Sequence, residues 1–268
     1  MAYAWSRYAI QPIDRRERAH HVFHMTEALD AIRLHSISKR FCTSGSGADV
    51  LRGLTLQVRA GEIFGVIGVN GSGKTTVLEI IAAAQLPSSG SGTVAGYDLL
   101  SQPEQVREAV GYCPANLESF YPRLTGRANL EFFAALRNMS PSEGTSQSRA
   151  ILELINAVEL SDTLFQRYST GMKQKLSLAR ALLGSPAIVL LDEPTRSLDP
   201  VARREFQDLL RHIVVASRKS AVLVTHNLDE ARRICDRVAL LENGIITHVW
   251  DARNLPAESA LALREPAA

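Results

Sequence analysis

The sequence has no uninterrupted apolar run of the length that a membrane-spanning helix needs. Although 46% of its 268 residues are hydrophobic, no stretch approaches about eighteen consecutive apolar residues. We therefore expect that this chain does not span a membrane. Its first residues also lack the apolar core that a secretory signal requires. The hydrophobic content is instead ample for a sizeable core.

The sequence also has few cysteines and a small net charge. The three cysteines, Cys42, Cys113 and Cys235, are widely separated and form no Cys-x-x-Cys pair. That pattern indicates a reducing compartment and argues against a metal cluster. The net charge is only +2 and no dense basic stripe is present, so nucleic acid is not expected as an obligate partner. No internal repeat is visible, and the length fits one large or two small domains.

A phosphate-binding loop is present at residues 68–76, GVNGSGKTT, and it fits the pattern G-x-x-x-x-G-K-[ST]. Residues 62–67 have the pattern of a buried strand entering the loop, and residues 77–81 that of a helix leaving it. This order disfavours the alternative, a chance Gly/Ser loop that ends in a lysine. Glycines let backbone N–H groups point at an anion, and the helix N-terminus adds partial positive charge. We predict a mononucleotide site made of Gly68, Asn70, Gly71, Ser72, Gly73, Lys74, Thr75 and Thr76.

Two residues of this loop have predicted chemical roles. Lys74 supplies a compact cation for the β- and γ-phosphates, which makes it one of three predicted catalytic residues. Thr75 supplies a hydroxyl that is placed to ligate Mg²⁺. ATP and Mg²⁺ are therefore the expected ligands.

A pair of carboxylates follows a run of apolar residues at 187–191. Five apolar residues in a row suit a central parallel strand that is buried on both faces, and open α/β sheets bind ligands at the carboxyl ends of such strands. We predict that Asp192 holds Mg²⁺, mainly through water. Glu193 is predicted to orient or deprotonate an attacking water. The alternative is that one of the two merely begins a turn before Pro194.

Three further motifs narrow the class of nucleotide-binding protein that the sequence resembles. The segment YSTGMKQ at residues 168–174 contains Ser-x-Gly-x-x-Gln, and it precedes the acidic strand. Ser197-Leu198-Asp199 and Thr225-His226 follow that strand. In this order, the motifs resemble the nucleotide-binding subunit of an ABC transporter over roughly residues 31–250. The resemblance implies an α/β fold: a P-loop NTPase core with a mainly parallel sheet, an antiparallel β layer and an inserted helical lobe.

The resemblance also implies a homodimer, in which two subunits close head to tail over two ATP molecules. Ser169 and Gly171 would then contact the γ-phosphate of the ATP that is bound in the other subunit. Asp199 would belong to the loop that links the two sites across the interface. Residues 172–183 also have the pattern of an ordinary amphipathic helix, so the role of Ser169 depends mainly on motif order.

Two more roles follow from the resemblance, each with a simpler alternative. His226 would be the switch histidine that senses the γ-phosphate, although a histidine after a strand is often only structural. Phe41 falls where an aromatic ring stacks on adenine, although an aromatic before a Ser/Gly-rich turn could simply be a hydrophobic plug.

The organisation of the chain follows from periodicity and turn residues. Alternation within residues 32–36 and 54–58 predicts antiparallel strands around a turn at residues 43–49. A helical lobe is expected at about residues 112–178, with a polar linker at residues 140–147 between two helices. A last core strand is expected at about residues 237–241, before an Asn243-Gly244 turn.

We expect a single ABC ATPase domain at residues 25–250, followed by a tail at residues 251–268 that carries no chemical signal. Residues 1–24 are expected to be a dispensable, solvated and charged extension. His20 and His24 would share a helix face there, but two histidines without a third ordered ligand make a poor metal site.

One position departs from the family pattern. Most members carry a glutamine after Gly-Tyr-x-Pro, whose side chain reaches Mg²⁺ and the attacking water and relays closure to the permease. Here Gly111-Tyr112-Cys113-Pro114 is followed by Ala115, and Asn116 offers only a shorter amide one residue later. We expect this departure to affect the coupling step more than nucleotide binding.

The resemblance extends to a branch of exporters for drugs, polysaccharides and lipids. It implies an ATPase subunit that drives a separate integral-membrane permease from the cytoplasmic face of the membrane. The alternatives are a soluble ABC-type ATPase and an ATP-dependent dimerisation switch with a non-transport partner. The first usually has two cassettes or a long coiled-coil insert, and this sequence has neither.

Overall fold

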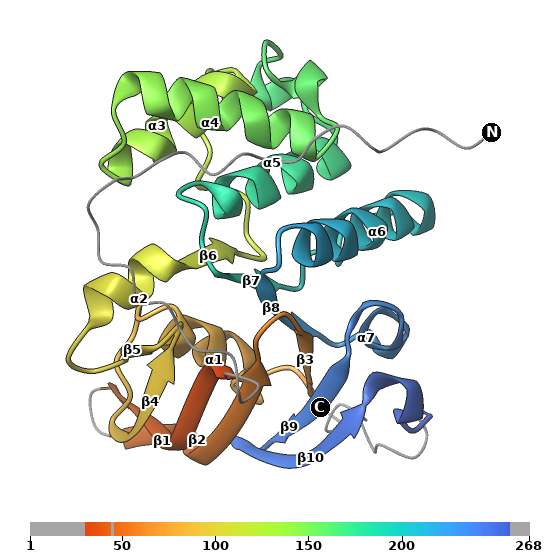
Figure 1. The fold of residues 1–268 in the computed structure, drawn as a ribbon. Coiled ribbons are helices and arrows are strands. Elements are labelled where there is room, and N and C mark those ends of the chain that lie inside the picture. Colours follow the sequence, from red (N-terminus) through yellow and green to blue (C-terminus); the bar gives the residue numbers. More distant parts are fainter. Residues whose placement is uncertain (1–29, 44–45, 258–268) are drawn as a thin grey trace.

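Two β-sheets and a helical lobe make up the molecule, with the lobe above the sheets in Figure 1. The structure is a computed structural model, and it describes residues 30–43 and 46–257. The expected N-terminal extension and the last eleven residues of the chain lie outside these ranges. None of the helices within them is both long and apolar enough to cross a membrane.

The first sheet is the antiparallel layer that the sequence predicts. Its strand order is β2-β1-β4-β5, and β1 and β2 pair antiparallel. Ile32 and Leu34 are buried whereas Arg33 and His35 are exposed, so one face of β1 covers the core. The strands are β1 (Asp30–Thr43), β2 (Ser46–Arg59), β4 (Ser89–Val94) and β5 (Tyr97–Asp98).

The second sheet is mainly parallel, with the order β10-β9-β3-β8-β7-β6. Only β10 runs antiparallel to its neighbour. All residues of β3, β7 and β8 are buried, because helices and the other sheet cover both faces of these apolar runs. The strands are β3 (Ile63–Ile67), β6 (Val110–Cys113), β7 (Ile188–Asp192), β8 (Ser220–Thr225), β9 (Arg237–Glu242) and β10 (Ile245–Asp251).

The predicted Asn243-Gly244 turn joins β9 to β10. Both residues have positive φ, 49° and 80°, which suits the mirror-image turns that connect hairpin strands. The chain then continues into a short 3-10 helix (Ala252–Asn254), and Ala252 and Leu255 are buried in the core. The domain limit at residue 250 stays a prediction, and apolar packing continues past it.

The helical lobe consists of α3 (Gly126–Leu136), α4 (Pro141–Leu154) and α5 (Thr170–Leu182), with short 3-10 turns at Val158–Leu160 and Phe165–Arg167. The predicted polar linker at residues 140–147 is wrong, because most of it forms the first half of α4. Ser140 Oγ accepts a hydrogen bond from the Glu143 N–H (3.3 Å), and Glu143 Oε2 accepts one from the Ser140 N–H (2.9 Å). This reciprocal capping box starts a helix in a segment whose polar side chains mostly face solvent.

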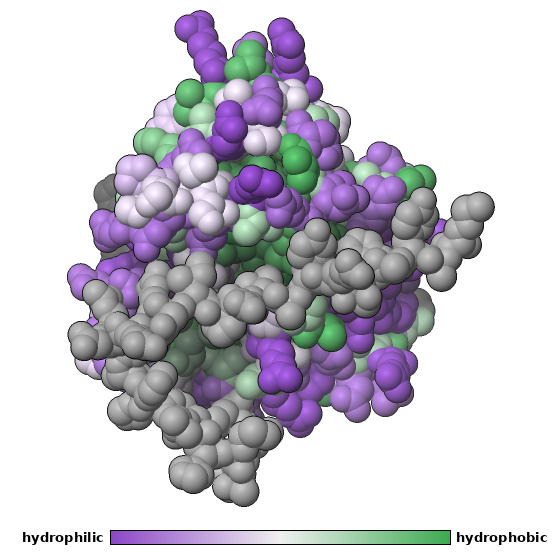
Figure 2. All heavy atoms as spheres, turned by 45° about the horizontal axis from the view of Figure 1, so that its top comes forward, coloured by the Kyte–Doolittle hydropathy of each residue, from purple (hydrophilic) through white to green (hydrophobic). Residues whose placement is uncertain are grey.

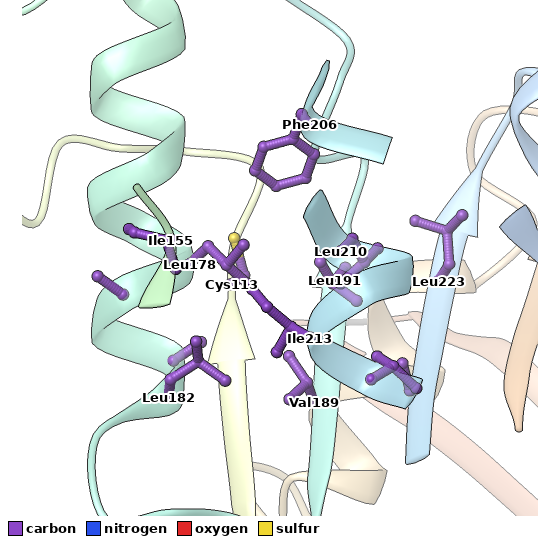
Figure 3. Close-up of a cluster of buried hydrophobic side chains, with 14 of the residues drawn as sticks. Cys113, Ile155, Leu178, Leu182, Val189, Leu191, Phe206, Leu210, Ile213 and Leu223 are labelled. Carbon is purple, nitrogen blue, oxygen red and sulfur yellow. The ribbon is translucent and has the colours of Figure 1, made fainter. Parts of the chain in front are cut away.

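Packing holds the lobe to the mainly parallel sheet. Figure 3 shows Leu178 and Leu182 of α5 in one apolar cluster with Cys113 of β6 and Leu191 of β7. Arg137, at the end of α3, donates to the carbonyls of Leu183 (2.6 Å) and Val110 (2.8 Å). The helix that begins with the Ser-x-Gly motif therefore has a fixed position relative to the strands.

The remaining helices cover the sheets, and they are α1 (Lys74–Ile81), α2 (Pro103–Ala109), α6 (Pro200–Ala216) and α7 (Leu228–Ile234). On the face drawn in Figure 2, hydrophilic and hydrophobic side chains are interspersed over the helical end of the molecule.

Candidate nucleotide site

The carboxyl ends of three parallel strands contribute to one pocket of about 330 Å³. The phosphate-binding loop follows β3, Ala115 follows β6, and the two carboxylates lie at the end of β7. This is the edge at which open α/β sheets bind ligands. The pocket is lined by Val50, Asn70, Gly71, Gly73, Lys74, Thr75, Thr76, Ala115, Asp192, Glu193 and Arg196.

Glycine is required at three positions of the phosphate-binding loop. Gly71 and Gly73 have φ values of 80° and 103°, a region that side chains disfavour. A Cβ on Gly68 would lie only 2.4 Å from the Leu241 carbonyl oxygen. Ser72 Oγ is buried without a hydrogen-bond partner among the described residues. The loop thus has the backbone conformation and the unpaired polar atom of an anion-binding cradle.

Lys74 is buried at the first position of α1. Its Nζ donates to the carbonyl oxygens of Gly68 (2.8 Å) and Val69 (2.9 Å). Burial lowers the pKa of Lys74, and the nearby charges of Glu193 and Asp192 oppose that shift. An anionic ligand in the pocket would favour the charged form of this lysine further.

Thr75 and Asp192 form the part of the pocket that fits a magnesium ion. Thr75 Oγ1 donates to Asp192 Oδ2 (2.9 Å), and the Tyr112 hydroxyl donates to the same oxygen (3.4 Å). Burial raises the pKa of Asp192, while the hydrogen bond from Thr75 opposes the shift. Mg²⁺ prefers oxygen ligands and keeps several waters. One hydroxyl and one carboxylate side by side suit that chemistry, and phosphate and water would supply the remaining ligands.

Glu193 and His226 form a close pair beside the pocket. His226 Nδ1 donates to Glu193 Oε2 (2.6 Å), with the Glu193 side chain 11% exposed and that of His226 54% exposed. Glu193 has φ 48°, and its N–H donates to the Val224 carbonyl oxygen (2.9 Å). A left-handed backbone at a non-glycine residue costs about 1–3 kcal/mol and persists only where its surroundings fix it. The carboxylate is therefore held at the rim of the pocket, oriented by the histidine.

The remaining predicted site residues do not line this pocket. Ser169 is the N-cap of α5, where its Oγ accepts from the Met172 N–H (3.2 Å). Asp199 is the N-cap of α6 and accepts from two backbone N–H groups of the first turn. A Cβ on Gly171 would lie 3.9 Å from the Ala202 Cβ. The starts of α5 and α6 therefore lie side by side, outside the pocket of their own chain.

Phe41 also lies outside the pocket lining. It belongs to β1 and pairs with Ala48 of β2, and Lys39 Nζ lies 5.0 Å from the centre of its ring. Its predicted adenine-stacking role stays a prediction.

Two pocket residues were missed by sequence reasoning, Val50 and Arg196. Arg196 lies three residues after Glu193, and its N–H donates to the Glu193 carbonyl oxygen (3.2 Å). That spacing was the available signal, because a tight turn returns the third residue toward the strand end.

The side-chain amide of Asn116 is hydrogen-bonded to Glu118. The Glu118 N–H donates to Asn116 Oδ1 (2.8 Å), and the Glu118 carboxylate accepts from Asn116 Nδ2 (3.1 Å).

Comparisons with known proteins agree with this geometry. A family model described as ABC transporter matches residues 51–196. The chain is 35% identical over 241 residues to ATP-binding cassette sub-family A member 7 of Rattus norvegicus, covering 88% of this chain and 11% of that protein. It is 36% identical over 215 residues to the retinal-specific phospholipid-transporting ATPase ABCA4 of Homo sapiens, covering 80% of this chain and 9% of that protein. The chain thus spans about a tenth of the length of these two relatives.

Solved structures show the same fold. A dimeric bacterial ABC transporter cassette has a TM-score of 0.74 and 25% identity, covering 84% of this chain and all of that one. The protein cbiO1 from Clostridium perfringens, part of the ABC transporter complex cbiONQ, has a TM-score of 0.75 at 21% identity, covering 84% of this chain and 89% of that one. With its family match, its α/β fold and its assembled phosphate-binding pocket, this chain belongs to the ATP-binding domains of ABC transporters.

Proposed function

We propose that the chain is the ATP-hydrolysing subunit of an ABC exporter, and that two copies close head to tail over two ATP molecules to drive a separate membrane permease. The observation that carries this proposal is the division of the motifs. Lys74, Asp192 and Glu193 share one pocket, whereas Ser169 and Gly171 lie outside it. A second copy would supply the missing half.

In the proposed reaction, a water oxygen attacks the γ-phosphorus of ATP and the bond to the β–γ bridging oxygen breaks, giving ADP and inorganic phosphate. Glu193 accepts the proton of the attacking water, and His226 keeps the carboxylate oriented. Lys74 stabilises charge on the phosphate oxygens. When bound at Thr75 and Asp192, Mg²⁺ would neutralise further phosphate charge.

The start of α5 has the chemistry to bind phosphate from a partner subunit. Ser169 Oγ already accepts a hydrogen bond from the Met172 N–H, so its own hydrogen stays available to donate to a phosphate oxygen. The N-terminus of this thirteen-residue helix adds partial positive charge. Gly171 has no side chain to keep a phosphate away, and Asp199 lies at the start of the neighbouring helix. These features support the head-to-tail arrangement.

The proposed permease contact lies in the segment between Ala115 and α3. Tyr121 and Leu124 expose apolar surface there, and Tyr121 packs edge-on against Phe132 of α3 (4.8 Å between ring centres). Through such a contact the subunit would sit at the inner face of a membrane. The phospholipid named for the human relative makes a lipid one candidate cargo. No nucleic acid is expected as a partner.

Phosphate release from ATP tests the proposal. The purified chain is expected to release phosphate from ATP in the presence of Mg²⁺, and this release should stop when EDTA removes the metal. The rate of release should rise when the chain is co-purified with its permease. ATP-dependent dimerisation without phosphate release would instead favour a switch, which the alanine at position 115 makes the second candidate. Mg²⁺-dependent hydrolysis that no membrane protein stimulates would favour a soluble ATPase.

A further inference from the structure

The pocket contains an arginine that none of the recognised nucleotide-binding motifs uses. We propose that the guanidinium of Arg196 binds the γ-phosphate of ATP within its own chain, in a pocket where Ala115 offers no polar side chain. This inference rests on the proposed function, because it assigns a further positioning residue to the same site.

The backbone beneath Arg196 is fixed. The Arg196 N–H donates to the Glu193 carbonyl oxygen (3.2 Å), which closes a turn directly after the catalytic carboxylate. One residue earlier, the buried Thr195 Oγ1 donates to Glu230 Oε1 (2.7 Å). The Glu230 N–H in turn donates to Asn227 Oδ1 (3.0 Å), at the start of α7. These bonds hold the loop, so the base of the arginine side chain has a defined position at the rim of the pocket.

The side chain itself is available for a ligand. Arg196 is exposed, and its guanidinium makes no ion pair with any of the other described residues, including Glu193 of the same turn. A guanidinium is planar, always charged and shaped to donate two hydrogen bonds to a phosphate group. It therefore suits an anionic ligand that enters the pocket.

The charges that line the pocket also favour this assignment. Two carboxylates, Asp192 and Glu193, face two cations, Lys74 and Arg196. Without Arg196 the lining residues would carry a net negative charge, which opposes a triphosphate. Ala115 also lines the pocket but ends at a methyl group, and the amide of Asn116 is held by Glu118. Arg196 is thus placed to supply a polar contact that the side chain at position 115 cannot make.

Nucleotide affinities test the proposal without any need for turnover. In the Glu193→Gln background, which blocks hydrolysis, Arg196→Ala is expected to weaken MgATP binding about tenfold to a hundredfold and to leave MgADP binding nearly unchanged. Arg196→Lys keeps the charge but loses the second hydrogen bond, so an intermediate ATP affinity is expected. Ala115→Gln added to Arg196→Ala is expected to recover part of the loss, because it returns an amide to the pocket. Arg204→Ala, an exposed arginine on α6 outside the pocket, serves as the matched control.

The outcomes separate the possibilities clearly. An Arg196→Ala variant that binds MgATP as tightly as its parent overturns the proposal, and so does an equal loss of MgATP and MgADP affinity. A glutamine at position 115 that recovers nothing overturns the claim that Arg196 replaces that contact. Unchanged MgADP affinity also shows that the variant is folded. If the wild-type chain failed to hydrolyse ATP, the proposed function would fail while these affinities stayed informative.

Discussion

Glu193→Gln is expected to reduce ATP turnover about a hundredfold to ten-thousandfold, the usual contribution of a general base. A glutamine has the same shape as the glutamate, and its amide oxygen can still accept the hydrogen bond from His226 Nδ1 that Glu193 accepts at 2.6 Å. It cannot take a proton from water. ATP binding should therefore persist while hydrolysis stops, and ATP should hold two copies together. Phosphate release and size-exclusion chromatography with MgATP measure the two effects.

Glu205→Gln is a suitable control for that experiment, because Glu205 is exposed on α6 and outside the pocket. It should turn over ATP like the wild type. Normal turnover in the Glu193→Gln variant would contradict the assignment of Glu193 as the base.

Lys74→Ala should nearly abolish ATP binding. Hydrogen bonds to charged groups contribute about 1.5–3 kcal/mol each, so loss of two phosphate contacts predicts an affinity roughly a hundredfold to ten-thousandfold lower. The ammonium also donates hydrogen bonds to the Gly68 and Val69 carbonyl oxygens. Its removal should therefore also lower the melting temperature by a few degrees in a small domain. Equilibrium binding of a fluorescent ATP analogue measures the affinity.

A thermal melt of the same sample separates loss of the phosphate contact from loss of the fold. If the Lys74→Ala variant melts cooperatively and still binds ATP like the wild type, Lys74 is not a phosphate ligand and the nucleotide site lies elsewhere.

Local patterns were sufficient to predict the central sheet and the phosphate-binding loop. The apolar runs of β3, β7 and β8 are continuous because these strands are buried on both faces. Gly71 and Gly73 occupy backbone conformations that few other residues adopt, so their spacing is visible in the sequence. The chemistry of the loop depends on neighbours in the chain, and for that reason it was predictable, whereas the fold class was predicted from the resemblance that the order of the motifs carries.

The sequence-based predictions were wrong or incomplete in two kinds of place. One is where a polar composition suggested a linker although the capping residues start a helix, and the other is where segments that are distant in the sequence meet. The linker expected at residues 140–147 is polar, but its capping box and Pro141 start α4 there. Attention to Ser140 and Glu143 would have corrected this prediction. The spacing of Arg196 after Glu193 indicates a turn at the end of β7, but its presence in the pocket also requires the β7 loop to lie beside the β3 loop, which is distant in the sequence. The Thr75–Asp192 hydrogen bond joins the same two loops.

The proposed roles of Ser169 and Gly171 require an ATP molecule that is bound in a second copy of the chain. Substituting aspartate at Gly171 should not disturb the fold, since the nearest atom to an added Cβ would lie 3.9 Å away and acidic residues are favourable in a first helical turn. The same carboxylate would repel the phosphates of an ATP brought by a second copy. Gly171→Asp therefore disables the half-site at the start of α5 without disturbing the fold. Lys74→Ala disables the half-site at the phosphate-binding loop.

A mixing experiment tests the shared site most directly. Two variant chains are made, one with Gly171→Asp and Glu193→Gln and the other with Lys74→Ala and Glu193→Gln. Retention of radiolabelled ATP through rapid gel filtration is then measured for each chain alone and for an equal mixture of the two. If each site needs two copies, neither chain alone retains ATP, whereas the mixture does, with one intact site per mixed dimer. A mixture that retains no more ATP than its two components would contradict the head-to-tail dimer.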